Sequence, residues 1–178
     1  MGHACAGWLT FALIILLWPG NSLRADSVSN SSSNSSVATL DYQEMKSGVI
    51  NWSVSITTQD SAFKKEPPAV PGKIVRGVLE IGPNASNAIP FLWQRGAGKL
   101  YLGLDRDEDL TAPTAGVFKA RNAEIIYYQT FTNVHLVLNT AFGRCPVSAD
   151  ITVWDNGGEP RCNFWVHSLW QGKLTLQG

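Results

Sequence analysis

Alternation of apolar and polar residues predicts the first strands of this chain. Near the start of the domain, four apolar residues alternate with small polar ones: Ile50, Trp52, Val54 and Ile56. A period of two places such residues on one face of an extended chain, so the pattern predicts a strand over 50–57 with one buried face. Similar patterns predict further strands at 73–81, 89–94 and 99–104.

The second half of the chain is also rich in residues that favour strands. Residues 124–139 are dense in Ile, Tyr, Phe, Thr and Val, which predicts two strands with a bend near 130–133. Residues 151–154 and 163–170 flank Asn156-Gly157, a pair that suits a two-residue hairpin turn. A last strand is predicted at 173–177, and no stretch shows a convincing helical period.

These segments sum to about seven to nine short, mostly antiparallel strands. Such a count with short turns predicts an all-β fold, a single small sandwich or barrel. The proline-rich loop at 60–72 interrupts the strands, because proline cannot continue a central strand. The β-rich domain is predicted to cover 39–178.

The first residues indicate export. Residues 8–18 are uncharged and almost entirely apolar, but this run is shorter than the about 20 residues that a membrane-spanning helix needs. It fits a signal peptide over 1–25, cleaved after Ala25 or Ser22. Because no Lys or Arg precedes the run, an uncleaved N-terminal anchor is the alternative. Residues 26–38 are mostly Ser and Asn and predict a flexible linker.

Charge excludes one class of partner. The chain has 14 Lys and Arg residues and 14 Asp and Glu residues, and the signal peptide holds only Arg24 of these, so the mature chain carries a net charge near −1. No polybasic stretch suggests nucleic acid as a partner. From the signal peptide, we expect a protein secreted to the extracellular space or cell envelope, with no membrane span after signal cleavage. Its expected ligand is an extracellular protein or polysaccharide.

Two cysteines remain after Cys5 leaves with the signal peptide. Cys145 and Cys162 form an even pair in an exported chain, and an oxidising compartment favours a disulfide between them. The bridge would join the base of the last hairpin to the loop before it. Two buried free thiols are the alternative.

Three aspartates alternate directly after a predicted strand: Asp105, Asp107 and Asp109. Closely spaced carboxylates on a tight loop can supply several of the oxygen ligands that calcium takes. The stretch YLGLDRDEDLTAP resembles the Asp-rich calcium loops of bacterial secreted and cell-surface proteins. That resemblance implies calcium as a possible cofactor bound by these three residues. Gly103 and Glu108 depart from the loop pattern, and a solvated acidic turn at a sheet edge is the alternative.

Candidate catalytic and sugar-binding groups are few. His135 and His167 are the histidines of the mature chain, and no catalytic motif surrounds either, so no catalytic residue is assigned. Trp165 lies on the opposite strand face from its apolar neighbours Phe164 and Val166, which predicts that its ring is exposed.

The sequence therefore predicts a secreted, non-catalytic β-domain for surface binding or adhesion, possibly stabilised by calcium. A small secreted hydrolase, or a fragment of one, is an alternative that requires a cleft holding a histidine beside a carboxylate. A carbohydrate-binding module is a third reading, and it requires exposed tryptophans on one face.

Overall fold

The computed structural model describes residues 39–45, 50–140 and 143–173. The signal peptide predicted at 1–25 and the linker predicted at 26–38 lie outside these residues. Two units are distinguished, 45–168 and the terminal segments. In the terminal segments, β1 (Thr39–Glu44) and β10 (Ser168–Lys173) form a two-stranded sheet. No helix in the described part of the chain is long and apolar enough to cross a membrane.

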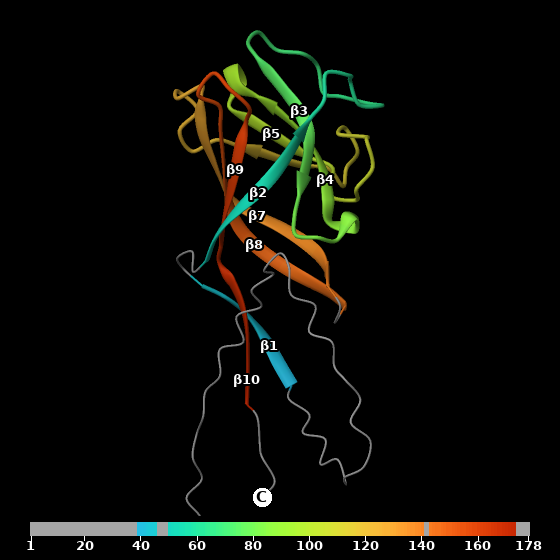
Figure 1. Ribbon diagram of the computed structural model, residues 1–178, viewed down its shortest axis with the longest axis vertical. Coiled ribbons are helices and arrows are strands. Elements are labelled where there is room, and N and C mark those ends of the chain that lie inside the picture. Colours follow the sequence, from blue (N-terminus) through green and yellow to red (C-terminus); the bar gives the residue numbers. More distant parts are fainter. Residues whose placement is uncertain (1–38, 46–49, 141–142, 174–178) are drawn as a thin grey trace, which may run out of the picture. The chain divides into compact units, whose positions relative to one another are not determined.

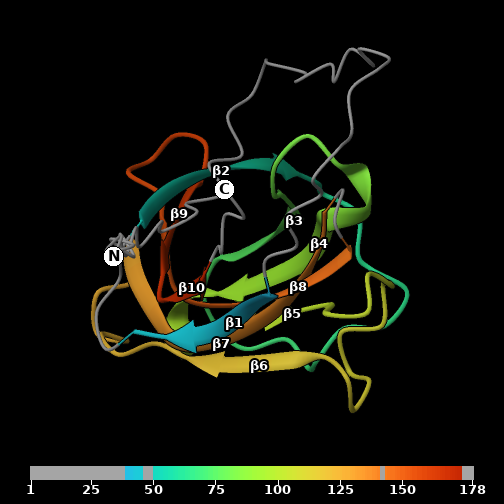
Figure 2. The same cartoon turned by 90° about the horizontal axis from the view of Figure 1, so that it is seen from below.

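The larger unit is built around one eight-stranded antiparallel sheet. Its elements are β2 (Ile50–Thr58), β3 (Ile74–Glu80), η1 (Ala85–Asn87), β4 (Ala88–Gln94), η2 (Arg95–Ala97), β5 (Lys99–Leu102), β6 (Gly116–Lys119), β7 (Tyr128–Thr140), β8 (Gly143–Trp154) and β9 (Arg161–Val166). The strand order in this sheet is β6-β5-β4-β3-β2-β9-β8-β7. Neighbouring strands are consecutive in the chain except at the centre of this order, where β2 pairs with β9. The sheet curls until it nearly closes into a barrel (Figures 1 and 2). This confirms the predicted all-β sandwich or barrel.

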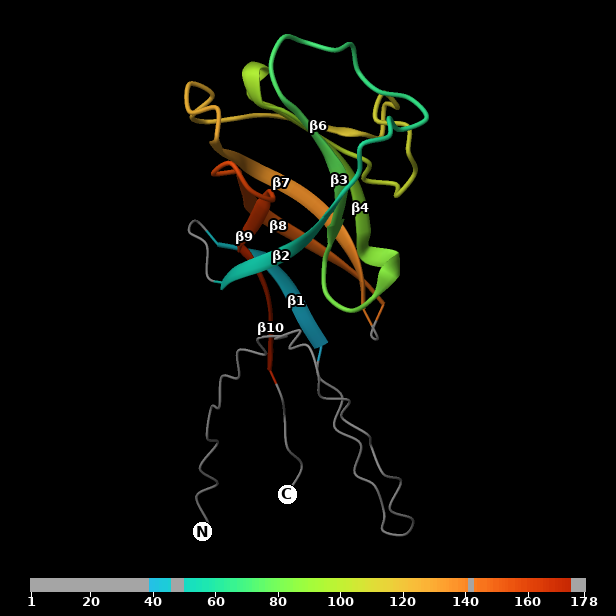
Figure 3. The same cartoon turned by 45° about the horizontal axis from the view of Figure 1, so that its top comes forward.

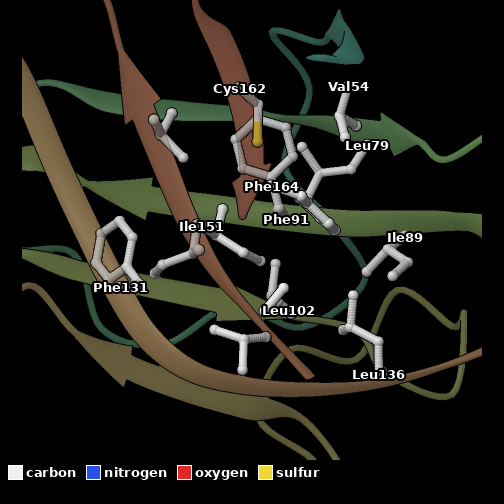
Figure 4. Packing of buried hydrophobic residues seen from close by; sticks show 14 of the residues in the cluster. Val54, Leu79, Ile89, Phe91, Leu102, Phe131, Leu136, Ile151, Cys162 and Phe164 are labelled. Atoms are coloured by element: carbon white, nitrogen blue, oxygen red, sulfur yellow. The ribbon is translucent and has the colours of Figure 1, made fainter. Parts of the chain in front are cut away.

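Side chains fill the interior of this barrel. Inward residues alternate along each strand, as the period of two requires. Figure 4 shows large apolar side chains from opposite strands meeting there. The largest fully buried ones are Trp93, Phe91, Phe131 and Phe164. A small barrel packed in this way leaves its outer faces and ends for binding.

A second, smaller apolar cluster lies on the outside of β3, β4 and β5. It consists of Phe63, Leu92, Tyr101 and Leu110, with Ile74 packed against it. Two long loops cover this face, since Phe63 comes from the loop between β2 and β3 and Leu110 from the loop between β5 and β6. Arg76 of β3 donates two hydrogen bonds to the Glu66 carboxylate, at 2.6 and 2.8 Å, and anchors the first loop.

β6 and β7 are the two edge strands of this sheet, and individual hydrogen bonds link their surroundings. Figures 2 and 3 show these strands next to each other. The Arg121 backbone N–H donates to the Thr130 carbonyl at 2.8 Å, and the Thr130 N–H donates to Asn122 Oδ1 at 2.8 Å. Farther along β7, the Arg106 guanidinium donates to the Val137 carbonyl. Individual hydrogen bonds therefore link the two edges of the sheet where the barrel nearly closes.

The predicted strands at 50–57, 73–81, 89–94 and 99–104 are confirmed as β2 to β5. Two strands were predicted within 124–139, but one is present, β7, which begins only at Tyr128, because 124–127 do not form a strand. The predicted bend is present as a bulge between Phe131 and Val134. Asn133 in that bulge has a φ of 56°. Strands β1 and β6 were not predicted.

The last hairpin differs from the prediction in its turn. Trp154 lies opposite Arg161, so six residues (155–160) connect β8 and β9 where a two-residue turn at Asn156-Gly157 was predicted. Asp155 explains the wider loop. Its N–H donates to the Tyr127 carbonyl at 2.9 Å, and its Oδ1 accepts the Gly157 N–H at 2.8 Å. These two bonds hold Asp155 in the loop, so β8 ends at Trp154 and the turn is longer than predicted.

Candidate functional site

The three aspartates of the predicted calcium loop each accept hydrogen bonds from the loop itself. Asp105 Oδ2 accepts the Thr114 hydroxyl at 2.6 Å. Asp107 Oδ1 accepts the Asp109 N–H at 3.0 Å. Asp109 Oδ1 accepts both the Thr111 N–H at 3.0 Å and the Thr111 hydroxyl at 2.6 Å. These are the bonds with which aspartate folds a tight turn onto its own backbone.

Lys65 ties this acidic loop to the loop between β2 and β3. Its ammonium lies 2.7 Å from Asp109 Oδ2, and its backbone forms a parallel bridge with Asp109. The hydrogen bond from Lys65, with further bonds from Thr111, lowers the pKa of Asp109 to about 2. Within the described residues no group of three His, Cys, Asp or Glu side chains is arranged to hold a metal ion. Calcium binding by Asp105, Asp107 and Asp109 stays a prediction, and an ion would have to compete with Lys65.

The two cysteines of the predicted disulfide lie on different parts of the barrel. Cys162 is buried and pairs in register with Val153, near the end of β8. Cys145 lies near the start of that strand, opposite Leu138. The eight steps from Cys145 to Val153 span about 26 Å in an extended strand, whereas bridged cysteines have Cα atoms within about 7 Å. This strand register does not bring the two sulfurs together. Non-reducing peptide mapping of secreted protein tests the disulfide.

A buried carboxylate organises the end of the barrel where β4 joins β5. The Asp155 side chain is only 1% exposed, and its Oδ2 lies 2.7 Å from Lys73 Nζ and 3.1 Å from Arg95 Nη1. Arg95 also stacks over the Trp93 ring, with the guanidinium carbon 5.3 Å from the ring centroid. The Trp93 indole N–H donates to the buried Gln129 at 2.7 Å. This connected network is structural, because each of its polar groups has a partner within the domain.

An aromatic face covers the outside of β7, β8 and β9. We define it by Tyr128, Trp154 and Trp165, one from each strand. Trp165 is 44% exposed, as predicted from its place opposite Phe164 and Val166. Tyr128 and Trp154 lie side by side in register, with ring centroids 6.3 Å apart. Arg161 of β9 lies opposite Trp154, and Trp165 lies four residues farther along β9. Trp165 is therefore about 13 Å from Trp154, measured along the strands.

Polar side chains surround Trp165 on this face. In register, it lies between Asn51 of β2 and Asp150 of β8. Cross-strand neighbours on one face have Cβ atoms about 5 Å apart, so both side chains start next to Trp165. The next register row brings in Asn163, whose Oδ1 accepts the Ser53 hydroxyl at 3.2 Å. A flat ring bordered by amide and carboxylate groups can stack on an apolar surface and orient it by hydrogen bonds.

One of the two candidate histidines lies beside a carboxylate. His167 Nε2 is 3.3 Å from Asp150 Oδ1, which also accepts the Asn133 N–H at 3.1 Å. His135 is exposed on β7, opposite Ser148. A nucleophilic triad also requires a hydroxyl on the second nitrogen of the histidine. Among the described residues no hydroxyl is hydrogen-bonded to the His167 ring, so the arrangement lacks that third group.

A shallow pocket of about 330 Å³ lies elsewhere on the barrel, against η1. Thr57, Val78 and Asn84 contribute to its walls, and Glu80 is its single ionisable residue. The Thr57 hydroxyl donates to Glu80 at 2.5 Å, so this carboxylate is already engaged. One carboxylate without a second acid or base offers no pair for hydrolysis.

Comparisons with known proteins add no assignment. No protein-family model, no curated protein and no solved structure matches this chain. The site must therefore be interpreted from its own geometry.

Sequence reasoning found the exposed Trp165 but missed two other features of this barrel. The Tyr128–Trp154 pair was not recognised, because the register that joins them depends on the bulge in β7. Asp155 was interpreted as a turn residue, since the Asp-Asn-Gly-Gly sequence at 155–158 is typical of turns. Of the other tryptophans, Trp52 packs against the core and Trp93 is fully buried, whereas the side chain of Trp170 lies outside the described residues.

Proposed function

We propose that this chain is a secreted, non-catalytic domain that binds carbohydrate on its aromatic face. The exposed ring of Trp165, in register between Asn51 and Asp150, is the observation that carries the proposal. An exposed indole offers a flat apolar ring and an N–H donor, which together can bind the face and a hydroxyl of a sugar. The apolar residues 8–18 support export.

The packed barrel interior directs the proposal to an outer face. The core residues from all sides of the sheet meet in one cluster, so a ligand bound inside would have to displace them. The proposed site is therefore the outside of β7, β8 and β9, where the three rings lie. Asn51 and Asp150, the register neighbours of Trp165, offer an amide and a carboxylate to sugar hydroxyls.

Affinity electrophoresis and isothermal titration with soluble plant and microbial polysaccharides test this function. We expect at least one polysaccharide to bind the parent, and Trp165→Ala to weaken that binding at least about tenfold, as truncation of an aromatic anchor does. Val117→Ala is the matched control, since Val117 is exposed on β6 outside the aromatic face. Equal binding by the parent and Trp165→Ala would contradict the proposal, provided that both melt at the same temperature.

A hydrolase is a second candidate because of the His167–Asp150 pair. That reading requires the same polysaccharides to be cleaved. Release of reducing ends by the parent, lost in His167→Gln, would establish it and replace the binding proposal.

A further inference from the structure

Exposed cations flank the aromatic pair at one end of the barrel. We define this cationic rim by four residues: Lys99, Lys119, Arg121 and Arg161. Arg161 lies directly opposite Trp154 across the β8–β9 ladder. Arg121 lies on the other side of the pair, because its N–H donates to Thr130, two residues along β7 from Tyr128. Lys119 follows on β6, opposite Lys99 of β5.

The rim cations differ from the other two cations at this barrel end. Lys73 and Arg95 are both paired with Asp155. Among the residues that the structure describes, none of the four rim side chains forms a salt bridge. Lys99 and Lys119 even lie opposite each other, a like-charge arrangement that destabilises a sheet. Exposed positive charge without internal partners is therefore concentrated beside Tyr128 and Trp154.

The acidic groups of the domain do not cancel this charge. The acidic loop follows Leu102, at the opposite end of β5 from Lys99. Exposed charges farther apart than about 8 Å are largely screened at physiological salt. Among the described residues, the exposed carboxylates closest in sequence to Arg121 and Arg161 are Glu124 and Glu159, fewer than the rim cations. An anionic ligand can thus be attracted locally although the mature chain is nearly neutral.

We propose that the ligand of the aromatic face is an acidic polysaccharide, one whose sugar rings carry carboxylates. This rests on the proposed function and names the class of ligand. The rings of Tyr128, Trp154 and Trp165 stack on the sugars. Arg161 pairs with a carboxylate on one side of the Tyr128–Trp154 pair, and Arg121 with a carboxylate on the other. A planar guanidinium binds a carboxylate through two parallel hydrogen bonds, which suits repeated recognition along a polymer.

Three polymers distinguish this proposal from simpler ones. Polygalacturonate offers both sugar rings and carboxylates, a neutral dextran offers sugar rings alone, and polyglutamate offers carboxylates alone. Titration of the domain with each polymer therefore shows which of these features it binds. We expect polygalacturonate to bind at least about tenfold more tightly than either other polymer, and its affinity to fall as salt is raised.

Variants locate the effect on the rim. Arg161→Gln combined with Arg121→Gln should remove the preference for polygalacturonate, and Arg161→Lys should retain part of it. Arg144→Gln is the matched control, because Arg144 is exposed near the opposite end of β8 and loses the same charge. Melting curves check that each variant is folded.

The outcomes separate the two proposals. If dextran and polygalacturonate bind equally and Trp165→Ala abolishes both, the acidic ligand is wrong and carbohydrate binding stands. Polyglutamate binding as tightly as polygalacturonate would overturn the acidic-sugar proposal in favour of charge alone. Loss of preference in Arg144→Gln would equally overturn the assignment to the rim. If neither polysaccharide binds, the acidic-ligand proposal fails, and the wider polysaccharide set decides the proposed function.

Discussion

Asp155 and Asp109 form the same contact in two different surroundings. Each accepts a hydrogen bond from a lysine ammonium at 2.7 Å. The Asp155 side chain is 1% exposed and has a second cation, Arg95, at 3.1 Å, whereas Asp109 is 22% exposed and its partner Lys65 is 67% exposed. Water solvates the second pair well and hardly reaches the carboxylate of the first. Although the two lysine–aspartate distances are equal, removal of one partner should cost much more stability at Asp155 than at Asp109.

This difference reverses the order of importance that sequence suggests. Asp105, Asp107 and Asp109 attract attention because they are close together in the chain. Asp155 stands alone in a turn sequence, yet it joins the β8–β9 loop to Lys73, the residue before β3, and to Arg95 of η2. A buried charge without its partners is costly, while an exposed one is easily hydrated. Burial, which sequence does not report, decides which carboxylate matters to the fold.

The largest effect is expected from Asp155→Asn. The amide preserves the shape and can still accept the Gly157 N–H, but it leaves Arg95, whose side chain is 12% exposed, without its counter-ion. We expect a loss of about 2–3 kcal/mol in the free energy of unfolding, below the full range for a buried pair because Lys73 is 59% exposed. Urea unfolding measures it. Asp60→Asn, at an exposed carboxylate, is the control, and an equal loss there would remove the distinction.

Acid should reveal the same contrast. The hydrogen bond from Lys73 lowers the pKa of Asp155 below its ordinary 3.8, helped by the Gly157 N–H and by the charges of Lys73 and Arg95. As pH falls, the unfolded state therefore binds the proton first. The stability that Asp155 contributes is complete above about pH 4 and is lost as pH falls through the folded-state pKa. Between pH 5 and pH 3, the free energy of unfolding should fall more steeply in the parent than in Asp155→Asn. Parallel curves for the two proteins would contradict this assignment.

Asp109→Asn should change the melting temperature little. Its partner Lys65 is 67% exposed, so water screens this ion pair, and such pairs contribute little to stability. The backbone bridge between Lys65 and Asp109, with Leu110 buried beneath it, should hold the two loops together without the charge. A matched Leu110→Ala variant should lower the melting temperature clearly, because it opens a cavity in that cluster. If Asp109→Asn destabilised the protein as much as Leu110→Ala, the ion pair would have to hold the loops.

Sequence predicted the barrel well where periodicity alone decides. The alternation at Ile50 to Ile56 correctly gave the buried face of β2. The prediction from periodicity failed where side-chain hydrogen bonds or an unusual backbone conformation change the course of a strand. Asn133 adopts a left-handed backbone that keeps β7 continuous through its bend, and Asp155 widens the last turn. The short strand β6 exposes Val117 and half-buries Phe118, so its pattern is too weak to mark a strand.

The candidate site was predictable only in part for the same reason. Exposure of Trp165 follows from its neighbours within one strand, and the structure confirms it. The Tyr128–Trp154–Arg161 row depends on the registers of three strands, which no single segment encodes. The clustering of Lys99, Lys119 and Arg121 likewise requires knowing which strand ends meet. Composition shows only that the chain is nearly neutral. The fold is needed to show that these cations lie together at one end of the barrel.

Calcium provides the smallest and sharpest test of the acidic loop. In the parent, Asp109 Oδ2 is occupied by Lys65, so an ion must displace an ammonium to reach this carboxylate. Lys65→Gln removes that competitor while leaving Asp105, Asp107 and Asp109 in place. If the three aspartates bind calcium, binding to the native state raises the melting temperature by mass action. We expect millimolar calcium to raise it more in Lys65→Gln than in the parent, and a chelator to reverse the rise. Asp107→Ala, combined with Lys65→Gln, should abolish it. If calcium leaves all these proteins unchanged, the loop is a turn held by its own hydrogen bonds, with Lys65 as the cation that pairs with Asp109.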